Sequence, residues 1–256
     1  MENSIVVPWD FSERAKASFQ HAIILSKAIN RDIVLFHVVN KDSEKEAALK
    51  NLEEAADGLF SSFGTKAQFV CQKGDIYKSI NEFCTEISAT IVVMPLHNSK
   101  RAIKVITGSV IPFYLVQHPP KSDKITDIVV PIDHYEENRI QLNWVLFLGK
   151  LFSSNINIIK PFINSNARNK LMKKNMFFAK RLMDSKKIVY GIRTGKREVK
   201  FGNAIYNFSK EIDADLIFMM TYNFKEYMSV VDKENEVTPP ILCLNPRSLK
   251  IIPDKR

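Results

Sequence analysis

The sequence has few of the features that mark a secreted, membrane-bound or metal-binding chain. Its 256 residues hold three cysteines, Cys71, Cys84 and Cys243, none of them in a CxxC or CxxH pair. Their odd number and apolar surroundings indicate neither a disulfide framework nor a zinc site. No apolar run approaches about 18 residues, and the chain does not begin with a basic segment followed by an apolar one. We therefore expect a cytoplasmic protein without a membrane span.

Catalytic motifs are also missing. The five histidines are scattered, with no HExxH or HxGH pattern, and no Ser or Cys stands in a nucleophile-elbow context. The cysteines are expected to behave as small buried hydrophobes rather than as reactive thiols. We predict that the protein is not an enzyme and that it holds no metal.

What is present is an ordinary globular composition with an uneven charge. Hydrophobic residues make up 45% and charged residues 25% of the chain, which is enough to bury a full core. The net charge of +9 arises in the second half, because residues 1–123 hold 14 Lys+Arg against 14 Asp+Glu, and residues 124–256 hold 23 against 14. Such asymmetry indicates an acidic partner.

The excess of cations is concentrated in residues 168–200. There, twelve Lys and Arg face only Asp184 and Glu198. Apolar residues at helical spacing can cover a sheet and leave the cations toward solvent. One interpretation of this pattern is a solvated helix face. The other is an anion- or partner-binding patch around an exposed aromatic side chain, and such a patch would suit nucleic acid or an acidic protein. The buried set would be Leu171, Met172, Met176, Ala179 and Leu182, and the patch would be Lys170, Lys173, Lys174, Phe177, Lys180 and Arg181.

The sequence contains an internal repeat of two similar copies. IVVPWDFSERAKASFQHAIILSKAINRDIVLFHVV (5–39) aligns without a gap over IVVPIDHYEENRIQLNWVLFLGKLFSSNINIIKPF (128–162), and EISATIVVM (86–94) over EIDADLIFM (211–219). Between the copies, HPPKSDKIT (118–126) has the composition of a linker. We predict two domains, residues 1–120 and residues 121–256.

Within each half, short runs rich in Val and Ile alternate with longer segments of helical periodicity, a pattern typical of βαβ units on a parallel sheet. The strands are expected to be apolar on both faces, since helices would cover both sides of the sheet. Strands are predicted near 4–8, 33–39, 67–71, 90–94, 113–117, 127–132, 156–162, 187–192, 215–220 and 240–244, and first-half helices near 12–29, 43–62, 76–88 and 99–107.

Capping signals support the first two helices. Ser12 precedes an apolar-periodic run and can cap it, while Ser43 and Glu46 have the spacing of a capping box. Gly64 is expected to end the second helix in the left-handed conformation.

The IVVPWDFSE stretch, with LFHVV after the next helix and GDIYKSINEF leading into ATIVVM, resembles the universal stress protein family in its tandem two-domain form. The resemblance implies an α/β fold of two Rossmann-like (adenine nucleotide alpha hydrolase-like) domains. Each would hold a five-stranded parallel sheet in the order 3-2-1-4-5, and a pseudo-twofold would relate the two. The last strands, near 113–117 and 241–244, would pair at the interface between domains.

Many members of that family hold ATP at the carboxyl ends of strands 1 and 4. Carried over to this chain, the resemblance implies that Asp10 contacts adenosine, that the Val38 backbone contacts adenine, and that Met94 ends strand 4. Asp133 matches Asp10 in the second half. An Asp between a strand and a helix is equally suited to an N-cap or a turn, so these residues have two interpretations.

The resemblance breaks at the phosphate loop, which takes the form GxxGx9G(S/T) in ATP-binding members. By spacing alone, Pro95, Asn98 and Gly108-Ser109 reproduce it, with Pro and Asn in place of the first two glycines. Yet only three residues lie between Ser109 and Phe113, too few for the helix that a parallel crossover needs. We therefore predict a helix over 99–107, with Ser99 as N-cap and Gly108 as a left-handed terminator.

Two further residues agree with a lost loop. Pro95 has no N–H to offer a phosphate. Trp9 would place an indole where binders carry a small residue, and could fill the adenosine space. In the second half, no glycine separates the fourth and fifth strands.

The leading hypothesis is therefore a non-enzymatic stress protein that acts through protein contacts, without ATP or another cofactor. One alternative is an ATP- or AMP-binding switch that uses Asp10 and Val38, and a second is a polyanion or nucleic-acid binder that uses the 168–200 region. For partners, we expect other proteins or a second copy of the tandem chain, with nucleic acid disfavoured and no membrane.

Overall fold

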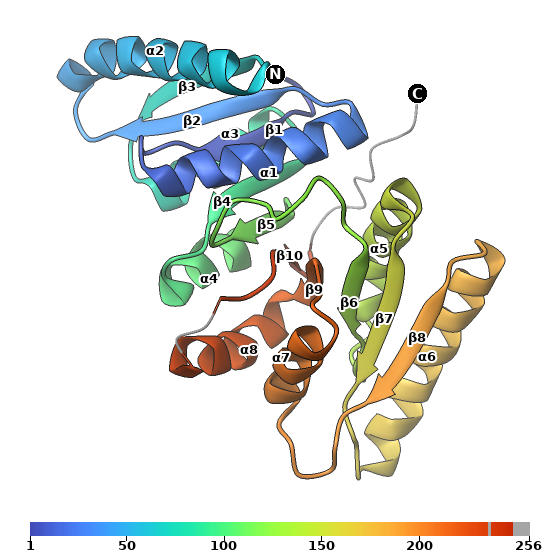
Figure 1. The fold of residues 1–256 in the computed structure, drawn as a ribbon. Helices are drawn as coiled ribbons and strands as arrows, with labels where there is room; N and C mark the ends of the chain where they lie inside the picture. Colours follow the sequence, from blue (N-terminus) through green and yellow to red (C-terminus); the bar gives the residue numbers. More distant parts are fainter. Residues whose placement is uncertain (235–236, 248–256) are drawn as a thin grey trace. The chain divides into compact units, whose positions relative to one another are not determined.

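The computed structural model describes residues 1–234 and 237–247 (Figure 1). The chain divides into two compact units, the first comprising Met1–Lys121 and the second beginning at Ser122. Residues 248–256 of the predicted second domain lie outside the described residues. Across the described part of the chain, no helix is long and apolar enough to cross a lipid bilayer.

Unit 1 is a five-stranded parallel sheet with helical crossovers. Its strand order is β3-β2-β1-β4-β5, which confirms the predicted order 3-2-1-4-5. Its elements are β1 (Ile5–Pro8), α1 (Glu13–Ile29), β2 (Ile33–Val39), η1 (Asp42–Glu44), α2 (Lys45–Phe63), β3 (Ala67–Lys73), α3 (Ile76–Glu86), β4 (Ile91–Pro95), α4 (Ser99–Gly108) and β5 (Phe113–Val116).

Unit 2 repeats this arrangement with the order β8-β7-β6-β9-β10, also parallel throughout. All ten predicted strands are therefore present, with boundaries shifted by at most a few residues. The elements are β6 (Asp127–Pro131), α5 (Asn138–Phe152), β7 (Asn155–Lys160), α6 (Asn166–Ser185), β8 (Tyr190–Thr194), α7 (Phe201–Glu211), β9 (Leu216–Met220), α8 (Thr221–Glu234) and β10 (Ile241–Leu244).

Burial of the strands depends on their place in each sheet. The central strands β1, β4, β6 and β9 consist almost wholly of buried residues, because helices cover both of their faces. The outer strands β3 and β8 do not fit the expectation of two apolar faces, since β3 is mostly half-buried and β8 mostly exposed. An outer strand has only one neighbour, so its side chains meet less of the helical layers.

The helix caps partly follow the sequence signals. Ser12 caps α1 as predicted, because its hydroxyl accepts the Ala15 N–H at 3.2 Å. Gly64 ends α2 with φ 67°, which also confirms the prediction. The capping box over Ser43 and Glu46 was wrong, since α2 follows a short 3-10 turn that is held by a different carboxylate.

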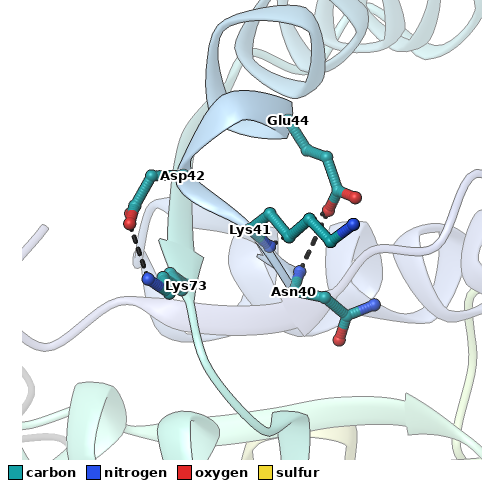
Figure 2. Close-up of polar contacts among 5 residues, drawn as sticks. All are labelled: Asn40, Lys41, Asp42, Glu44 and Lys73. Atoms are coloured by element: carbon teal, nitrogen blue, oxygen red, sulfur yellow. Dashed lines mark hydrogen bonds and ion pairs between the residues drawn. The ribbon is translucent and has the colours of Figure 1, made fainter.

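That turn follows β2 and is shown in Figure 2. The Glu44 carboxylate accepts the N–H groups of Asn40 and Lys41 at 3.1 and 3.2 Å. Lys73, at the end of β3, forms an ion pair with Asp42 at 2.6 Å and lowers the pKa of that carboxyl. These contacts order the chain just beyond the carboxyl end of β2, close to Val38.

A close approach of two helices in unit 2 depends on glycine. A Cβ on Gly202 of α7 would lie 2.8 Å from the carbonyl carbon of Glu226 in α8. We expect Gly202→Ala to lower the free energy of unfolding by about 2 kcal/mol, because backbone atoms must move apart. Gly58→Ala is the control, since Gly58 is an exposed glycine inside α2 with nothing within 4 Å of its Cβ.

The control should raise the free energy of unfolding by about 0.5 to 1 kcal/mol. Urea unfolding followed by circular dichroism measures both variants. Equal effects of the two substitutions would contradict the close packing of α7 against α8.

Candidate functional site

A cavity of about 320 Å³ lies in unit 1 at the carboxyl ends of β1 and β4. From β1 the chain crosses to β2 on one side and β4 lies on the other, so the strand order reverses here. Crevices at such a reversal are where open α/β sheets bind ligands. The lining residues are Pro8, Trp9, Asp10, His37, Val38, Ile76, Tyr77, Met94, Pro95, His97, Asn98, Arg101 and Ala102.

Three of the four residues carried over from the resemblance meet at this cavity. Asp10, Val38 and Met94 all line it, while Asp133 belongs to unit 2. Sequence reasoning did not single out His37, Tyr77 or Arg101 for this site. Their positions did hold a signal, because each lies at the carboxyl end of a strand or in the first turn of the helix that follows one.

Trp9 forms a wall of the cavity rather than filling it. Its side chain is 7% exposed and packs edge-on against Phe19 and Phe11, with ring centroids 6.4 and 6.5 Å apart. The indole therefore belongs to the core of unit 1, and open space remains beside it. Trp9 therefore does not close the cavity, and its place relative to adenosine stays a prediction.

Asp10 organises the turn between β1 and α1. Its Oδ1 accepts the Ser12 backbone N–H at 3.1 Å and the Ser12 hydroxyl at 2.5 Å. Ser12 in turn caps α1, so the carboxylate supports the cap from two residues earlier. Asp10 itself is exposed at the mouth of the cavity, and this geometry suits both of its predicted roles.

The same turn contains a strained residue. Phe11 has φ 63°, a conformation that costs a bulky side chain about 1 to 2 kcal/mol. Its ring lies edge-on to His37 at 5.1 Å, and the His37 Nδ1–H donates to the Trp9 carbonyl at 2.6 Å. These aromatic and hydrogen-bonding contacts hold the turn in place.

The stretch after β4 is a helix, as predicted. Helix α4 covers Ser99–Gly108, but its N-cap is Asn98, whose side chain accepts the Arg101 N–H at 3.0 Å. Naming Ser99 as the cap was therefore wrong by one residue. Gly108 is the last helical residue and does not have a positive φ, so the left-handed terminator was also wrong; Ser109 ends the helix in an extended conformation.

In unit 2, side chains bridge the space between the carboxyl ends of β6 and β9, which correspond to β1 and β4. Strand β9 ends at Met220 and α8 begins at Thr221, with no residue between them. The Asp133 carboxylate, which follows β6 and is 3% exposed, accepts a hydrogen bond from the Asn223 side-chain amide of α8 at 3.0 Å. Its other oxygen accepts the Asn138 side-chain amide and the Tyr135 N–H.

A fourth group completes this polar cluster. The Asn175 side-chain amide, from α6, donates to the backbone carbonyls of Asp133 and Tyr135 at 3.0 and 2.8 Å. Asp133 is thus held by residues from α5, α6 and α8. Its carboxylate is engaged within unit 2, which favours the structural interpretation of this residue.

The three thiols are poorly placed for chemistry. Cys71, Cys84 and Cys243 are buried and free, and burial raises the pKa of each thiol. A raised pKa keeps the sulfur protonated and weakly nucleophilic. Over residues 1–234 and 237–247, no group of three or more His, Cys, Asp or Glu side chains is arranged to hold a metal ion.

Helix α6 carries the basic patch predicted from the sequence. Phe177 is 67% exposed, and the five cations of the patch are exposed as expected. The predicted buried face was partly wrong, since Leu171 is 41% exposed and Leu182 half-buried. The residues that α6 buries are Met172, Asn175, Met176, Ala179 and Met183.

Comparison with known proteins gives a family match for unit 1 and a similar fold for the whole chain. Residues 1–122 match the model of the universal stress protein family. The whole chain is similar in fold to a universal stress protein from Archaeoglobus fulgidus DSM 4304, with a TM-score of 0.74 and 16% identity over 95% of this chain and 96% of that one.

A candidate universal stress protein from Pseudomonas aeruginosa UCBPP-PA14 is also similar, with a TM-score of 0.63 and 13% identity over 96% of this chain and 94% of that one. A comparison with curated protein sequences finds no match. The two structural likenesses concern the fold, and the family match rests on unit 1. The domain formed by residues 1–122 therefore belongs to the universal stress protein family.

Proposed function

We propose that this chain is a non-enzymatic stress-response protein of the cytosol that acts through protein contacts and does not hold a nucleoside triphosphate. The observation that carries the proposal is helix α4. It begins at Ser99, separated by three residues from the end of β4 at Pro95, and occupies the chain that would otherwise wrap the phosphates.

Phosphate cradles use glycines because their backbone N–H groups can approach anionic oxygens closely at the start of a helix. In unit 1 the residue that ends β4 is Pro95, which has no N–H to donate. In unit 2 the Asp133–Asn223 hydrogen bond bridges the gap between β6 and β9. Neither unit therefore offers the backbone that a triphosphate requires.

The side chains near the cavity support a binding or scaffolding role rather than catalysis. The His37 Nδ1–H donates a hydrogen bond to the Trp9 carbonyl, and within the described residues no thiol or hydroxyl forms a hydrogen bond with its ring. The buried, protonated cysteines also agree with a reducing cytosol.

Thermal melting with millimolar Mg-ATP tests this proposal. A ligand at a hundred times its dissociation constant raises the free energy of unfolding by about 2.7 kcal/mol. A gain of that size raises the melting temperature by several degrees. We expect a change of less than about 1 °C relative to magnesium chloride alone. A rise of several degrees would mean that a triphosphate binds, and the proposal would fail.

A second function is favoured by the cavity itself. At about 320 Å³ it reaches the lower limit of small-molecule sites, near 300 Å³, and Trp9, Tyr77 and Arg101 line it. These groups suit a flat ring and one anionic group, as in AMP. AMP should then raise the melting temperature when ATP does not, and Arg101→Ala should abolish the rise. Arg14→Ala is the control, because Arg14 is exposed on α1 and does not line the cavity.

A further inference from the structure

Strand β8 forms an edge of unit 2's sheet that is largely exposed. Strand β8 is the outermost strand, pairs with β7, and is exposed along most of its length. Val189, just before it, is 73% exposed, and Ile192 within it is 39% exposed. An uncovered edge strand presents a row of unpaired N–H and C=O groups to which another strand can add.

The backbone of this edge has its hydrogen-bonding groups turned outward at alternate residues. Ile156 N–H donates to the Val189 carbonyl at 3.1 Å, and Gly195 N–H donates to the Lys160 carbonyl at 2.8 Å. Positions 189, 191, 193 and 195 therefore face β7. Tyr190, Ile192 and Thr194 point their N–H and C=O groups away from the sheet, where a further strand would meet them.

Helix α6 places a row of lysines beside that edge. The Tyr190 hydroxyl donates to Asp184 of α6 at 2.9 Å, which fixes the side of the helix that faces β8. In Figure 1, α6 and β8 run beside each other at the edge of unit 2. Residues at helical spacing from Asp184 lie on the same stripe. This stripe, here called the α6 stripe, consists of Lys170, Lys173, Phe177 and Lys180.

The other flank of α6 faces α5 instead. Lys174 forms an ion pair with Glu136 at 3.6 Å, and Arg139 lies over the Phe178 ring at 5.1 Å. Within the described part of the chain, by contrast, the lysines of the α6 stripe have no ion-pair partner. Three lysines of α6, Lys170, Lys173 and Lys180, therefore lie without an ion-pair partner among the described residues on the flank next to the open strand.

These observations define the chemistry of an occupant. The outward backbone of β8 suits an extended peptide, the exposed Ile192 and Phe177 suit apolar side chains, and the lysines suit carboxylates. A second copy of this chain fits poorly, because its own edge would bring the same excess of twelve cations over two carboxylates in residues 168–200. Nucleic acid fits less well, since Phe177 offers a ring for one base while the β8 edge presents the aliphatic Val189 and Ile192 and outward backbone groups, which suit a peptide.

We infer that the β8 edge and the α6 stripe together bind an acidic segment of another protein, which adds as an extended strand beside β8 with carboxylates next to the lysines of α6. The inference rests on the proposed action through protein contacts and names the partner's chemistry. Strand β8 has five residues, so the segment in direct contact would be about five to seven residues long.

A random peptide library displayed on phage, with peptides of about twelve residues, is the probe, and the full chain is the bait. We expect enrichment of peptides in which Asp or Glu alternates with Val, Ile or Phe. The most enriched peptide, fluorescein-labelled, should bind in fluorescence anisotropy with an affinity that falls as salt is raised. Its binding should slow hydrogen exchange at the amides of Tyr190, Ile192 and Thr194.

Two matched variants separate backbone from side chain. Ile192→Pro removes an outward N–H without removing a bond to β7, and we expect it to weaken binding at least about tenfold. Ile192→Ala keeps the N–H and should weaken binding no more than about threefold. The exposed double variant Lys173→Glu with Lys180→Glu should also weaken binding about tenfold, and serves if Ile192→Pro does not fold.

The inference is overturned if no peptide is enriched, if the enriched peptides are not acidic, or if neither Ile192→Pro nor the double lysine variant weakens binding. It is also overturned if an oligothymidine of about 20 nucleotides binds through Lys173 and Lys180 while no peptide does. Self-association that Ile192→Pro abolishes would assign the edge to a second copy instead. None of these results depends on the Mg-ATP melt, so failure here is distinguishable from failure of the proposed function.

Discussion

Replacing Asp133 with alanine is expected to lower the free energy of unfolding by about 3 kcal/mol. The carboxylate is 3% exposed and accepts hydrogen bonds from Tyr135, Asn138 and Asn223. Without it, the side-chain amides of Asn138, which is buried, and Asn223, which is half-buried, both lose an acceptor inside unit 2. Each buried donor left unsatisfied costs about 1 to 3 kcal/mol.

Asp10→Ala is the matched control, because Asp10 holds the aligned position in the first copy of the repeat. Its carboxylate is exposed and bonds only to Ser12, so we expect a loss of about 1 kcal/mol or less. Urea unfolding at pH 7 measures both variants, with tryptophan fluorescence as the signal. A loss for Asp133→Ala no larger than that for Asp10→Ala would contradict the structural role and reopen Asp133 as a ligand contact.

Lowering the pH should destabilise unit 1 through His21. Its side chain is 6% exposed, and its Nε2–H donates to the His118 carbonyl at 3.0 Å. Burial lowers the pKa of His21 from 6.5 to about 4, and the bond to His118 opposes this only weakly. In the unfolded chain, His21 therefore binds a proton as the pH falls below about 6.5. In the folded chain, it binds that proton only near pH 4.

The sign of the effect follows from that difference. The unfolded state is stabilised as the pH falls through this window, so the free energy of unfolding drops by roughly 2 kcal/mol between pH 7 and pH 5, and by roughly 3 kcal/mol at pH 4. Above about pH 7.5, one unit over the pKa of the unfolded chain, the contribution of His21 is constant.

His21→Gln tests this, because an amide can also donate to the His118 carbonyl but does not titrate. We expect the variant to lose much less stability than the wild type between pH 7 and pH 5, a range in which few carboxylates change charge. His97→Gln is the control, since His97 is exposed at the rim of the cavity. Parallel pH profiles for wild type and His21→Gln would show that His21 is not the group responsible.

Much of the fold could be predicted from the sequence because its signals are local. Runs of Val and Ile mark all ten strands, and the repetition of one unit predicts the same strand order twice. The helix over 99–107 followed from chain length alone, since a parallel crossover needs a helix and no other segment was long enough to form one.

The sequence was less informative where a single residue decides the geometry. The N-cap of α4 is Asn98 rather than Ser99, and the turn before α2 is held by Glu44 rather than by the predicted capping box. In each place two nearby residues carry a side-chain oxygen that can accept a backbone N–H, so helix-capping propensity does not distinguish them. The direction of the backbone at the end of the preceding strand decides which oxygen reaches the N–H.

By itself, then, the sequence determined that two copies of an α/β unit exist, that each has five parallel strands, and that Asp10 and Asp133 hold equivalent positions. Only the tertiary structure decided that Asp10 is exposed beside a cavity while Asp133 is buried among three amides. Those amides come from α5, α6 and α8, which are far apart along the chain. Burial and hydrogen-bond partners arise from such distant contacts, and no local pattern around an aspartate encodes them.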